Sequence, residues 1–180
     1  MNKVEDNPNV LDVEAAKALC VRSFQLMVDG SPADFEAVVH PEAVNREAKD
    51  EPPASRGRGP AAFHATALWL RGWFEDLAFE VHDVVAEDDL VVVHNTMSGR
   101  HTGVATIYGE DGRLLQAMPP TGKRFAATQT HWFRLRDGRI VEHWANRDDQ
   151  GMAMQLGWVP PSPWYLLRMA VATRRARRRT

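Results

Sequence analysis

The chain has 180 residues, of which 44% are hydrophobic and 26% are charged, and its formal net charge is −2. This composition is typical of a globular protein with one domain, or one domain and a tail, and it argues against a nucleic-acid partner. The single cysteine, Cys20, excludes a disulfide framework and a cysteine-based zinc site. The first ten residues are polar and acidic, so we expect no signal peptide, no membrane span and a cytoplasmic location.

The first 75 residues contain three segments with the sequence pattern of α-helices. Apolar side chains recur at helical spacing in three segments, and a proline opens the second and the third. We expect helices over residues 11–29, 32–39 and 60–75. Residues 1–9 have the composition of a disordered leader, and EPPASRGRG at 51–59 has the composition of a loop.

Strand signals replace the helix signals after Leu77. Apolar and polar side chains alternate, and turn residues separate the alternating segments. We expect strands over residues 78–86, 90–102 and 123–136 and a last strand from residue 139, with two short edge strands or a loop at 103–122. A short helix at 148–156 then closes the domain. Three helices followed by a mostly antiparallel sheet predict an α+β domain over residues 10–158.

Asp137-Gly138 is a strong hairpin signal, and it sets the pairing of the last two strands. With a two-residue loop, His131 pairs with Trp144 and Gln129 pairs with Asn146, while His143 and Arg147 point to the opposite face. The first face changes from apolar near the turn to proton-handling groups at its far end, so we interpret it as the floor of a pocket. Phe133 belongs to the apolar end, and the far end contains Gln129, His131, Trp144, Asn146 and Asp148.

The side chains available for chemistry favour acid/base catalysis. The seven histidines lack metal-ligand spacing, no serine lies in a nucleophile motif, and Cys20 has apolar helical neighbours that predict a plain buried thiol. Asp148 is the first candidate, because a carboxyl in a partly apolar pocket has a raised pKa. The alternative is that Asp148 caps the following helix, although Asp149 could be that cap. His131 could likewise be a hydrogen-bonded core histidine.

Several motifs occur in the order and spacing of one protein family. They are SGRHTG at 98–103, PPTGK at 119–123, DGRIVEHW at 137–144, Asp148, and QLG at 155–157. Together they resemble the SnoaL-like polyketide cyclases, or ester cyclases, of the nuclear-transport-factor-2-like superfamily. The resemblance implies a cone-shaped α+β barrel, in which a curved sheet wraps over helices around a deep apolar cavity, and a homodimer formed through the sheet.

The resemblance also implies a chemistry. Characterised members close a ring of an aromatic polyketide by intramolecular aldol condensation, without metal or cofactor, and an aspartate matching Asp148 acts as the acid/base. We therefore expect an enzyme of lyase or isomerase type that acts on a small apolar carbonyl compound. His131 is expected to assist Asp148 in catalysis, and the remaining pocket residues are expected to be Gln129, Asn146, Trp144, Phe133, His101, Trp69 and Trp73.

Two other functions stay open. The run Asn146-Arg147-Asp148 has residue types that open epoxides, but Arg147 is expected to point away from Asp148. A protein that only binds an apolar ligand, or that only dimerises, is the non-enzymatic alternative. A buried Asp148 beside His131, with room for a ligand, would favour an enzyme. An exposed Asp148 cap and a cavity filled by Trp and Phe would favour binding.

Residues 159–180 form a tail that begins with a proline-rich segment. From Arg168 to the end the chain has six arginines and no acid, and Trp164, Leu166, Leu167 and Val171 form an apolar stripe. We expect a basic amphipathic helix docked on its own domain or on a dimer partner, with contact to an anionic surface, a membrane or a nucleic acid, as the alternative.

Overall fold

The computed structural model describes residues 12–179, so the leader predicted at 1–9 lies outside the described part. The three predicted helices are present as α1 (Val13–Asp29), α2 (Pro32–Val38) and α3 (Pro60–Arg71). The side chain of Asp12 caps α1 by accepting hydrogen bonds from the backbone N–H groups of Glu14 and Ala15. Prolines at the first helical positions begin α2 and α3, where a missing N–H costs nothing.

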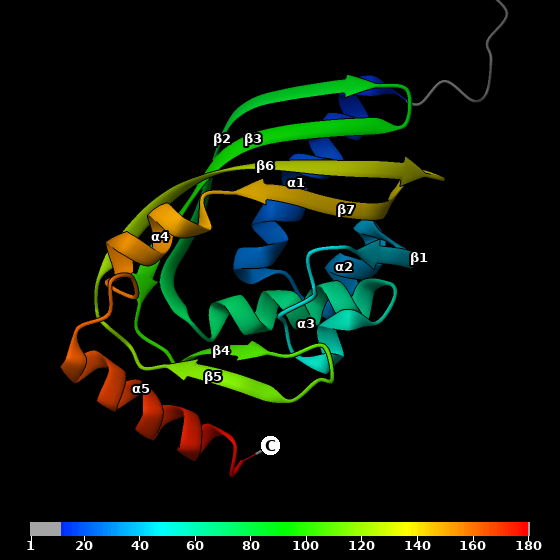
Figure 1. The fold of residues 1–180 in the computed structure, drawn as a ribbon. Helices are drawn as coiled ribbons and strands as arrows, with labels where there is room; N and C mark the ends of the chain where they lie inside the picture. Colours follow the sequence, from blue (N-terminus) through cyan, green and yellow to red (C-terminus); the bar gives the residue numbers. More distant parts are fainter. Residues whose placement is uncertain (1–11, 180) are drawn as a thin grey trace, which may run out of the picture.

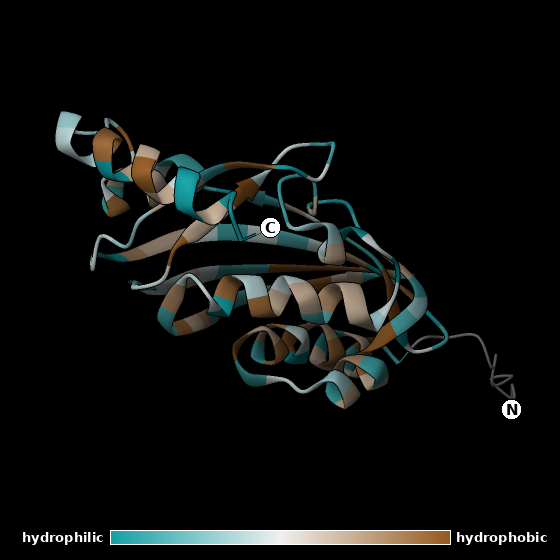
Figure 2. Ribbon diagram, turned by 90° about the horizontal axis from the view of Figure 1, so that it is seen from below, coloured by the Kyte–Doolittle hydropathy of each residue, from teal (hydrophilic) through white to brown (hydrophobic). Residues whose placement is uncertain are grey.

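A long curved sheet wraps around α1 and α3 (Figure 1). Its strands are β1 (Val39–Asn45), β2 (Phe74–Glu87), β3 (Leu90–His101), β6 (Arg124–Arg136) and β7 (Arg139–Arg147), in the order β1-β7-β6-β3-β2. All neighbours are antiparallel except β1 and β7, which are parallel. Buried residues alternate with partly or fully exposed residues along β3 and β6, and apolar and polar colours alternate along the strands in Figure 2. The predicted α+β class is confirmed.

One strand was not predicted. The sequence indicates a short turn at His40-Pro41-Glu42, but residues Val39–Asn45 form β1 along the free edge of β7. This strand brings Asn45 next to the last hairpin. The following loop, residues 46–52, then carries Glu47 and Glu51 to the same end of the molecule, ahead of the short 3-10 helix η1 (Pro53–Arg56).

The last hairpin has the predicted turn but a different register. Asp137 and Gly138 both have positive φ, at 53° and 69°, and Leu135 pairs with Ile140 as expected. The next pair is Arg134 with Glu142, so Val141 is an extra residue, a β-bulge, in β7. A shift of one residue turns every later side chain to the other face.

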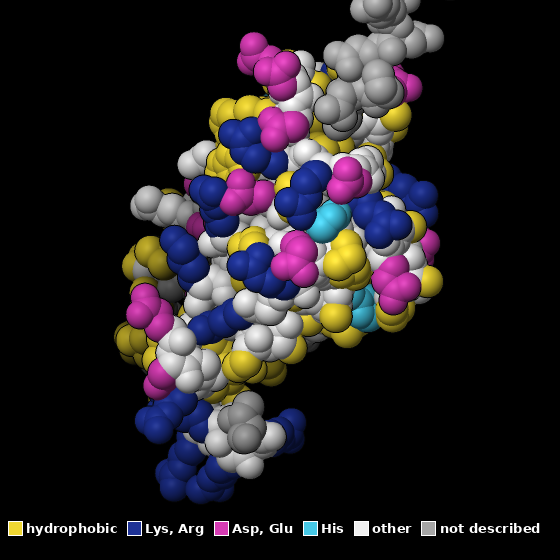
Figure 3. Space-filling model, turned by 90° about the vertical axis from the view of Figure 1, so that its right-hand side faces the viewer, with side chains coloured by type: hydrophobic (Ala, Val, Ile, Leu, Met, Phe, Trp, Pro, Cys, Tyr) yellow, Lys and Arg dark blue, Asp and Glu magenta, His cyan; other side chains and the backbone are white. Residues whose placement is uncertain are grey.

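The C-terminal helices follow the predicted bounds closely. Helix α4 (Asp149–Leu156) ends at Gly157, whose φ of 74° suits glycine, and α5 (Pro163–Ala176) is the predicted basic helix. Helix α5 packs on β5 (Leu114–Met118), which pairs with β4 (Ala105–Tyr108) in a separate two-stranded sheet. Lys and Arg side chains gather at this lower end of the molecule (Figure 3).

Candidate functional site

A cavity of about 330 Å³ lies between the helices and the concave face of the sheet. Its wall is mainly apolar, and the aromatic part includes Trp69, Trp73, Phe133 and Trp158. The Trp69 and Trp73 rings contact each other with centroids 4.1 Å apart, and the Trp69 indole N–H donates to the carbonyl oxygen of Thr106. The volume lies at the lower end of the range of small-molecule pockets. The cavity can therefore hold a flat apolar ligand.

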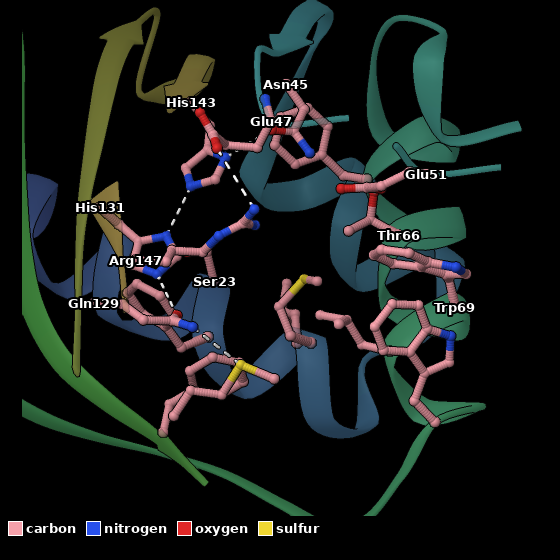
Figure 4. Close-up of a pocket in the computed structure, with 18 of the residues that line it drawn as sticks. Ser23, Asn45, Glu47, Glu51, Thr66, Trp69, Gln129, His131, His143 and Arg147 are labelled. Carbon is pink, nitrogen blue, oxygen red and sulfur yellow. Dashed lines mark hydrogen bonds and ion pairs between the residues drawn. The ribbon is translucent and has the colours of Figure 1, made fainter. Parts of the chain in front are cut away.

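A relay of hydrogen bonds crosses one wall of this cavity (Figure 4). Gln129 Oε1 lies 2.8 Å from His131 Nε2, and His131 Nδ1 lies 2.9 Å from His143 Nε2. His143 Nδ1 lies 2.9 Å from Asn45 Oδ1, which also accepts the backbone N–H of Glu47 at 3.1 Å. Both nitrogens of each imidazole are therefore engaged, which fixes the two rings.

The relay also fixes a proton count. Its three contacts lie between two amide oxygens, so each contact requires one proton, and three protons must be shared by four ring nitrogens. Two neutral imidazoles carry only two protons, because each has one N–H. Either the histidine pair holds one positive charge, or one terminal amide turns so that its NH₂ group donates to the ring.

The surroundings of the pair favour the neutral form. Burial lowers the pKa of His143 to about 3, and burial, with His143 and Arg147 as smaller causes, holds the pKa of His131 well below its usual value. Asn45 is held in place by the N–H of Glu47, whereas the Gln129 amide N–H donates to the Met97 sulfur, a weak acceptor, at 3.3 Å. Gln129 is therefore the amide that turns when both rings are neutral.

A buried carboxyl lies on the opposite wall. Glu51 is only 2% exposed, and its carboxyl accepts a hydrogen bond from the Thr66 hydroxyl of α3. Burial raises the pKa of Glu51 to about 7, against the opposing effect of the Thr66 hydrogen bond. Figure 4 shows Glu51 and Thr66 on one side of the cavity and Gln129 and His131 on the other. A group with this pKa can both accept and return a proton near neutral pH.

Arg147 is the cation between these walls. Its guanidinium lies 3.8 Å from a Glu47 carboxylate oxygen and 3.4 Å from an Asp149 carboxylate oxygen, and all three residues line the cavity. Partial burial raises the pKa of Asp149, while Arg147 lowers it. Burial outweighs the effect of Arg147, so the pKa of the Asp149 carboxyl is raised overall and this group retains its proton to a higher pH than an exposed aspartate.

Comparisons with known proteins agree with this geometry. The profile of the SnoaL-like polyketide cyclase family matches residues 18–156. The chain belongs to this family. The aklanonic acid methyl ester cyclase DnrD of Streptomyces peucetius is 32% identical over 139 residues, which cover 75% of this chain and 87% of that protein. The nogalonic acid methyl ester cyclase of Streptomyces nogalater is 30% identical over 136 residues, 75% of this chain and 89% of that protein.

A solved structure supports the fold of this SnoaL-like chain. TsrD of Streptomyces laurentii superposes with a TM-score of 0.65 at 27% identity, covering 82% of this chain and 98% of that chain. The predicted family and the nuclear-transport-factor-2-like fold are therefore confirmed. The family assignment also supports the expected class of enzyme, a polyketide-cyclase-like lyase or isomerase.

The cavity contains five of the predicted site residues, namely Gln129, His131, Phe133, Trp69 and Trp73. The bulge at Val141 places the other members of the hairpin differently. Trp144 stacks on Trp132 at 6.0 Å, with the Arg46 guanidinium over its ring, and Asn146 and Asp148 are exposed. The prediction that these three residues share the His131 face is wrong.

Asp148 acts as the N-cap of α4. Its carboxylate accepts the backbone N–H of Gly151 at 2.8 Å, so the alternative of an ordinary cap is confirmed. Of the two neighbouring aspartates, Asp148 and Asp149, the second is the one that lines the cavity. Position alone does not test catalysis, so the catalytic role of Asp148 stays a prediction. The structure thus combines an exposed cap with an open cavity that carries its own proton-handling groups.

His101 is buried outside the cavity lining. Its Nδ1 accepts the backbone N–H of Thr121 at 3.2 Å, and its ring packs edge-on against Trp158 at 5.1 Å. Burial lowers the pKa of His101 to about 4. These contacts give His101 a structural role beneath the aromatic wall.

Polar residues of this SnoaL-like site that the sequence prediction missed include Asn45, Glu47, Glu51, His143 and Arg147. The first three depend on β1 and its following loop, and the last two depend on the bulge. A bulge has no reliable signal in a single sequence, but the opposite-face set of the hairpin did contain His143 and Arg147. Treating both registers as possible would have found them.

Three further findings concern the described part of the chain. Within residues 12–179, no group of three His, Cys, Asp or Glu side chains is arranged to hold a metal ion. None of the helices in that same span combines the length and apolar character needed to cross a membrane. The Cys20 thiol is buried, and burial raises its pKa to about 12, which confirms the predicted unreactive thiol.

Proposed function

We propose that this protein closes a ring of an aromatic polyketide methyl ester by intramolecular aldol cyclisation, with Glu51 as the acid/base. The observation that carries the proposal is the buried Glu51 carboxyl, with a pKa of about 7, facing the relay across an aromatic cavity. Further support comes from DnrD and the Streptomyces nogalater relative, which are cyclases of methyl esters. The substrate of this chain is part of the proposal.

The chemical steps conserve every atom of the substrate. Glu51, as carboxylate, removes a proton from a carbon beside a carbonyl, and the resulting enolate carbon attacks a ketone carbon of the same molecule. One C–C bond forms, the ketone oxygen becomes an alkoxide, and the protonated Glu51 returns the proton to that oxygen. Product and substrate are therefore isomers. The pKa of about 7 suits both half-reactions at neutral pH.

The cation and the relay stabilise the charge that develops on oxygen. Arg147 supplies positive charge in the cavity, and the Gln129 amide supplies a donor held by His131. His131 therefore acts as a positioning residue, since both of its ring nitrogens are occupied. Trp69, Trp73 and Trp158 provide the apolar surface for the flat substrate.

Mass spectrometry of the product tests this function. Incubation of the purified protein with an aromatic polyketide methyl ester that carries an uncyclised side chain should give a product of unchanged mass and new retention time. Glu51→Gln should lower the rate by about 100-fold or more, as expected for loss of a general acid/base. Glu36→Gln, at an exposed position of α2, is the matched control. Full activity of Glu51→Gln would exclude the proposed role.

One observation favours a second function. Arg147 and Asp149 lie 3.4 Å apart and both line the cavity together with Asn45, so the residue types expected for epoxide opening occur there, with the asparagine from β1 and the aspartate from α4. Incubation of an apolar epoxide in ¹⁸O-water tests this alternative, since hydrolysis adds one labelled oxygen and raises the mass. A product isomeric with its substrate would instead support ring closure.

Two earlier expectations also stay proposals. We infer that the protein works in the cytoplasm, which the single free cysteine, Cys20, supports. A homodimer through the sheet is implied by the family. Light scattering coupled to size-exclusion chromatography tests it, and a mass of 20.3 kDa would indicate a monomer.

A further inference from the structure

Helix α5 is held firmly on one side. The Tyr165 hydroxyl donates to the Pro119 carbonyl oxygen at 3.1 Å, and the Thr173 hydroxyl accepts the Ala117 backbone N–H at 2.8 Å. Near the end of the helix, Arg177 donates to the Leu114 carbonyl oxygen at 2.9 Å. These contacts, spread along the helix, fix which residues α5 turns outward.

The outer face of α5 begins with apolar side chains. Trp164 is 69% exposed, Leu167 is 56% exposed and Val171 is 44% exposed. Their spacing of three and four residues places them on one side of the helix, away from Tyr165. In Figure 2 this helix changes from apolar to polar colours toward the C-terminus. Exposed large apolar side chains grouped in this way mark a contact surface.

The same outer face continues with arginines. Arg174, Arg175, Arg178 and Arg179 are exposed, and within residues 12–179 none of them forms an ion pair with an acid. Asp149 is the last acidic residue of the chain. Figure 3 shows the resulting concentration of basic side chains at the lower end of the molecule. The positive charge of this face is therefore not neutralised by the protein itself.

We propose that the outer face of α5 binds the surface of an anionic lipid bilayer. Trp, Leu and Val side chains fit the boundary between headgroups and acyl chains, and the arginines that follow fit the lipid phosphates. A nucleic acid would engage the arginines but would gain little from exposed Leu167 and Val171. A short apolar patch or a basic cluster alone binds membranes weakly, so the combination is what makes this face effective. This inference does not depend on the proposed cyclisation.

Vesicle co-sedimentation tests the inference with the full chain. The protein should bind vesicles that contain phosphatidylglycerol and phosphatidylcholine, should not bind pure phosphatidylcholine, and should be released as salt is raised. Each arginine near an anionic surface is worth about 5-fold in affinity, so R174Q/R175Q/R178Q should bind about 100-fold more weakly. R22Q/R100Q/R113Q is the matched control, because it removes the same charge from exposed ion pairs elsewhere.

The apolar half of the face needs its own test. Trp164→Ala with Leu167→Ala should weaken vesicle binding at least about 10-fold, since both side chains lose their contact with the acyl boundary. The control removes similar exposed side chains elsewhere, as Leu68→Ala with Val85→Ala. Equal binding to neutral vesicles, or unchanged binding by the triple arginine variant, would overturn the inference. So would binding to DNA or polyglutamate that is as tight as binding to anionic vesicles and is independent of Trp164 and Leu167.

Discussion

His131 Nδ1 and His143 Nε2 lie 2.9 Å apart, and this contact joins the buried His131 ring to the half-buried His143 ring across neighbouring strands. Neither ring has a free nitrogen, because Gln129 and Asn45 occupy the outer positions. The histidine pair therefore fixes the positions of the two amide side chains. The charge of the pair depends on whether each amide presents its oxygen or its NH₂ group to the ring. The four side chains form one unit with the cavity wall.

The proton count of the relay predicts the effect of Gln129→Glu. A carboxylate only accepts hydrogen bonds, so it cannot supply the donor that a neutral histidine pair needs. The pair should then hold a third proton, and its apparent pKa should rise toward neutrality. NMR titration of the imidazole nitrogens measures this rise. Gln155→Glu, at an exposed position, should leave the pair unchanged, and an unchanged titration in Gln129→Glu would contradict the proton count.

The raised pKa of Glu51 predicts that this residue makes the protein less stable as the pH rises. Its pKa is raised from 4.5 to about 7 in the folded protein, so the folded state binds a proton that the unfolded state has already lost between these values. The free energy of unfolding should therefore fall as the pH rises through this window, by about 3 kcal/mol for this group. Glu51→Gln removes the contribution, so its stability should exceed that of the wild type at pH 8.

Urea unfolding at a series of pH values measures the Glu51 contribution as a difference between variant and wild type. The buried histidines have the opposite sign, since their lowered pKa values favour folding as the pH rises, but they are present in both proteins. Glu36→Gln should retain the wild-type dependence. A constant difference between Glu51→Gln and the wild type from pH 4 to 8 would show that the Glu51 pKa is not raised.

Removal of the Asp148 side chain is expected to lower the stability of the protein with little loss of activity. Its carboxylate accepts the Gly151 N–H at the start of α4, so Asp148→Ala should lower the free energy of unfolding by about 1 kcal/mol. Asp148→Ser, which keeps a cap acceptor, should restore most of that loss. Chemical denaturation of the three proteins provides the comparison. A stability loss in Asp148→Ser equal to that in Asp148→Ala would argue against capping.

The sequence predicted the elements and the family well, because those depend on local patterns. Helical spacing, prolines and Asp137-Gly138 are all short-range signals, and the observed turn and its first pairs match them. The prediction of the site residues was wrong where contacts between distant parts of the chain determine the structure. β1 pairs with β7 although about 100 residues separate them in the sequence. Arg46 and Arg134 form ion pairs with Glu142, the residue that follows the bulge. No local pattern contains that information.

The same limit explains why Glu51 was missed. It lies in a loop rich in proline and charge, which the sequence correctly predicts as a loop. Its burial depends on Thr66 of α3 and on the fold of the loop over the cavity. Asp148, in contrast, has a strong local signal before a helix, and that signal describes a cap.

The measurement that tests the central claim most directly is solvent deuterium exchange at the carbon beside the substrate carbonyl, because it isolates the proton-abstraction step. In deuterated buffer at pH 7.5, about half a unit above the Glu51 pKa, the wild type and Asp148→Asn should both exchange this proton. Glu51→Gln should exchange it about 100-fold more slowly while keeping the same fold by circular dichroism. Rapid exchange by Glu51→Gln together with lost exchange by Asp148→Asn would contradict the account and assign the proton to Asp148.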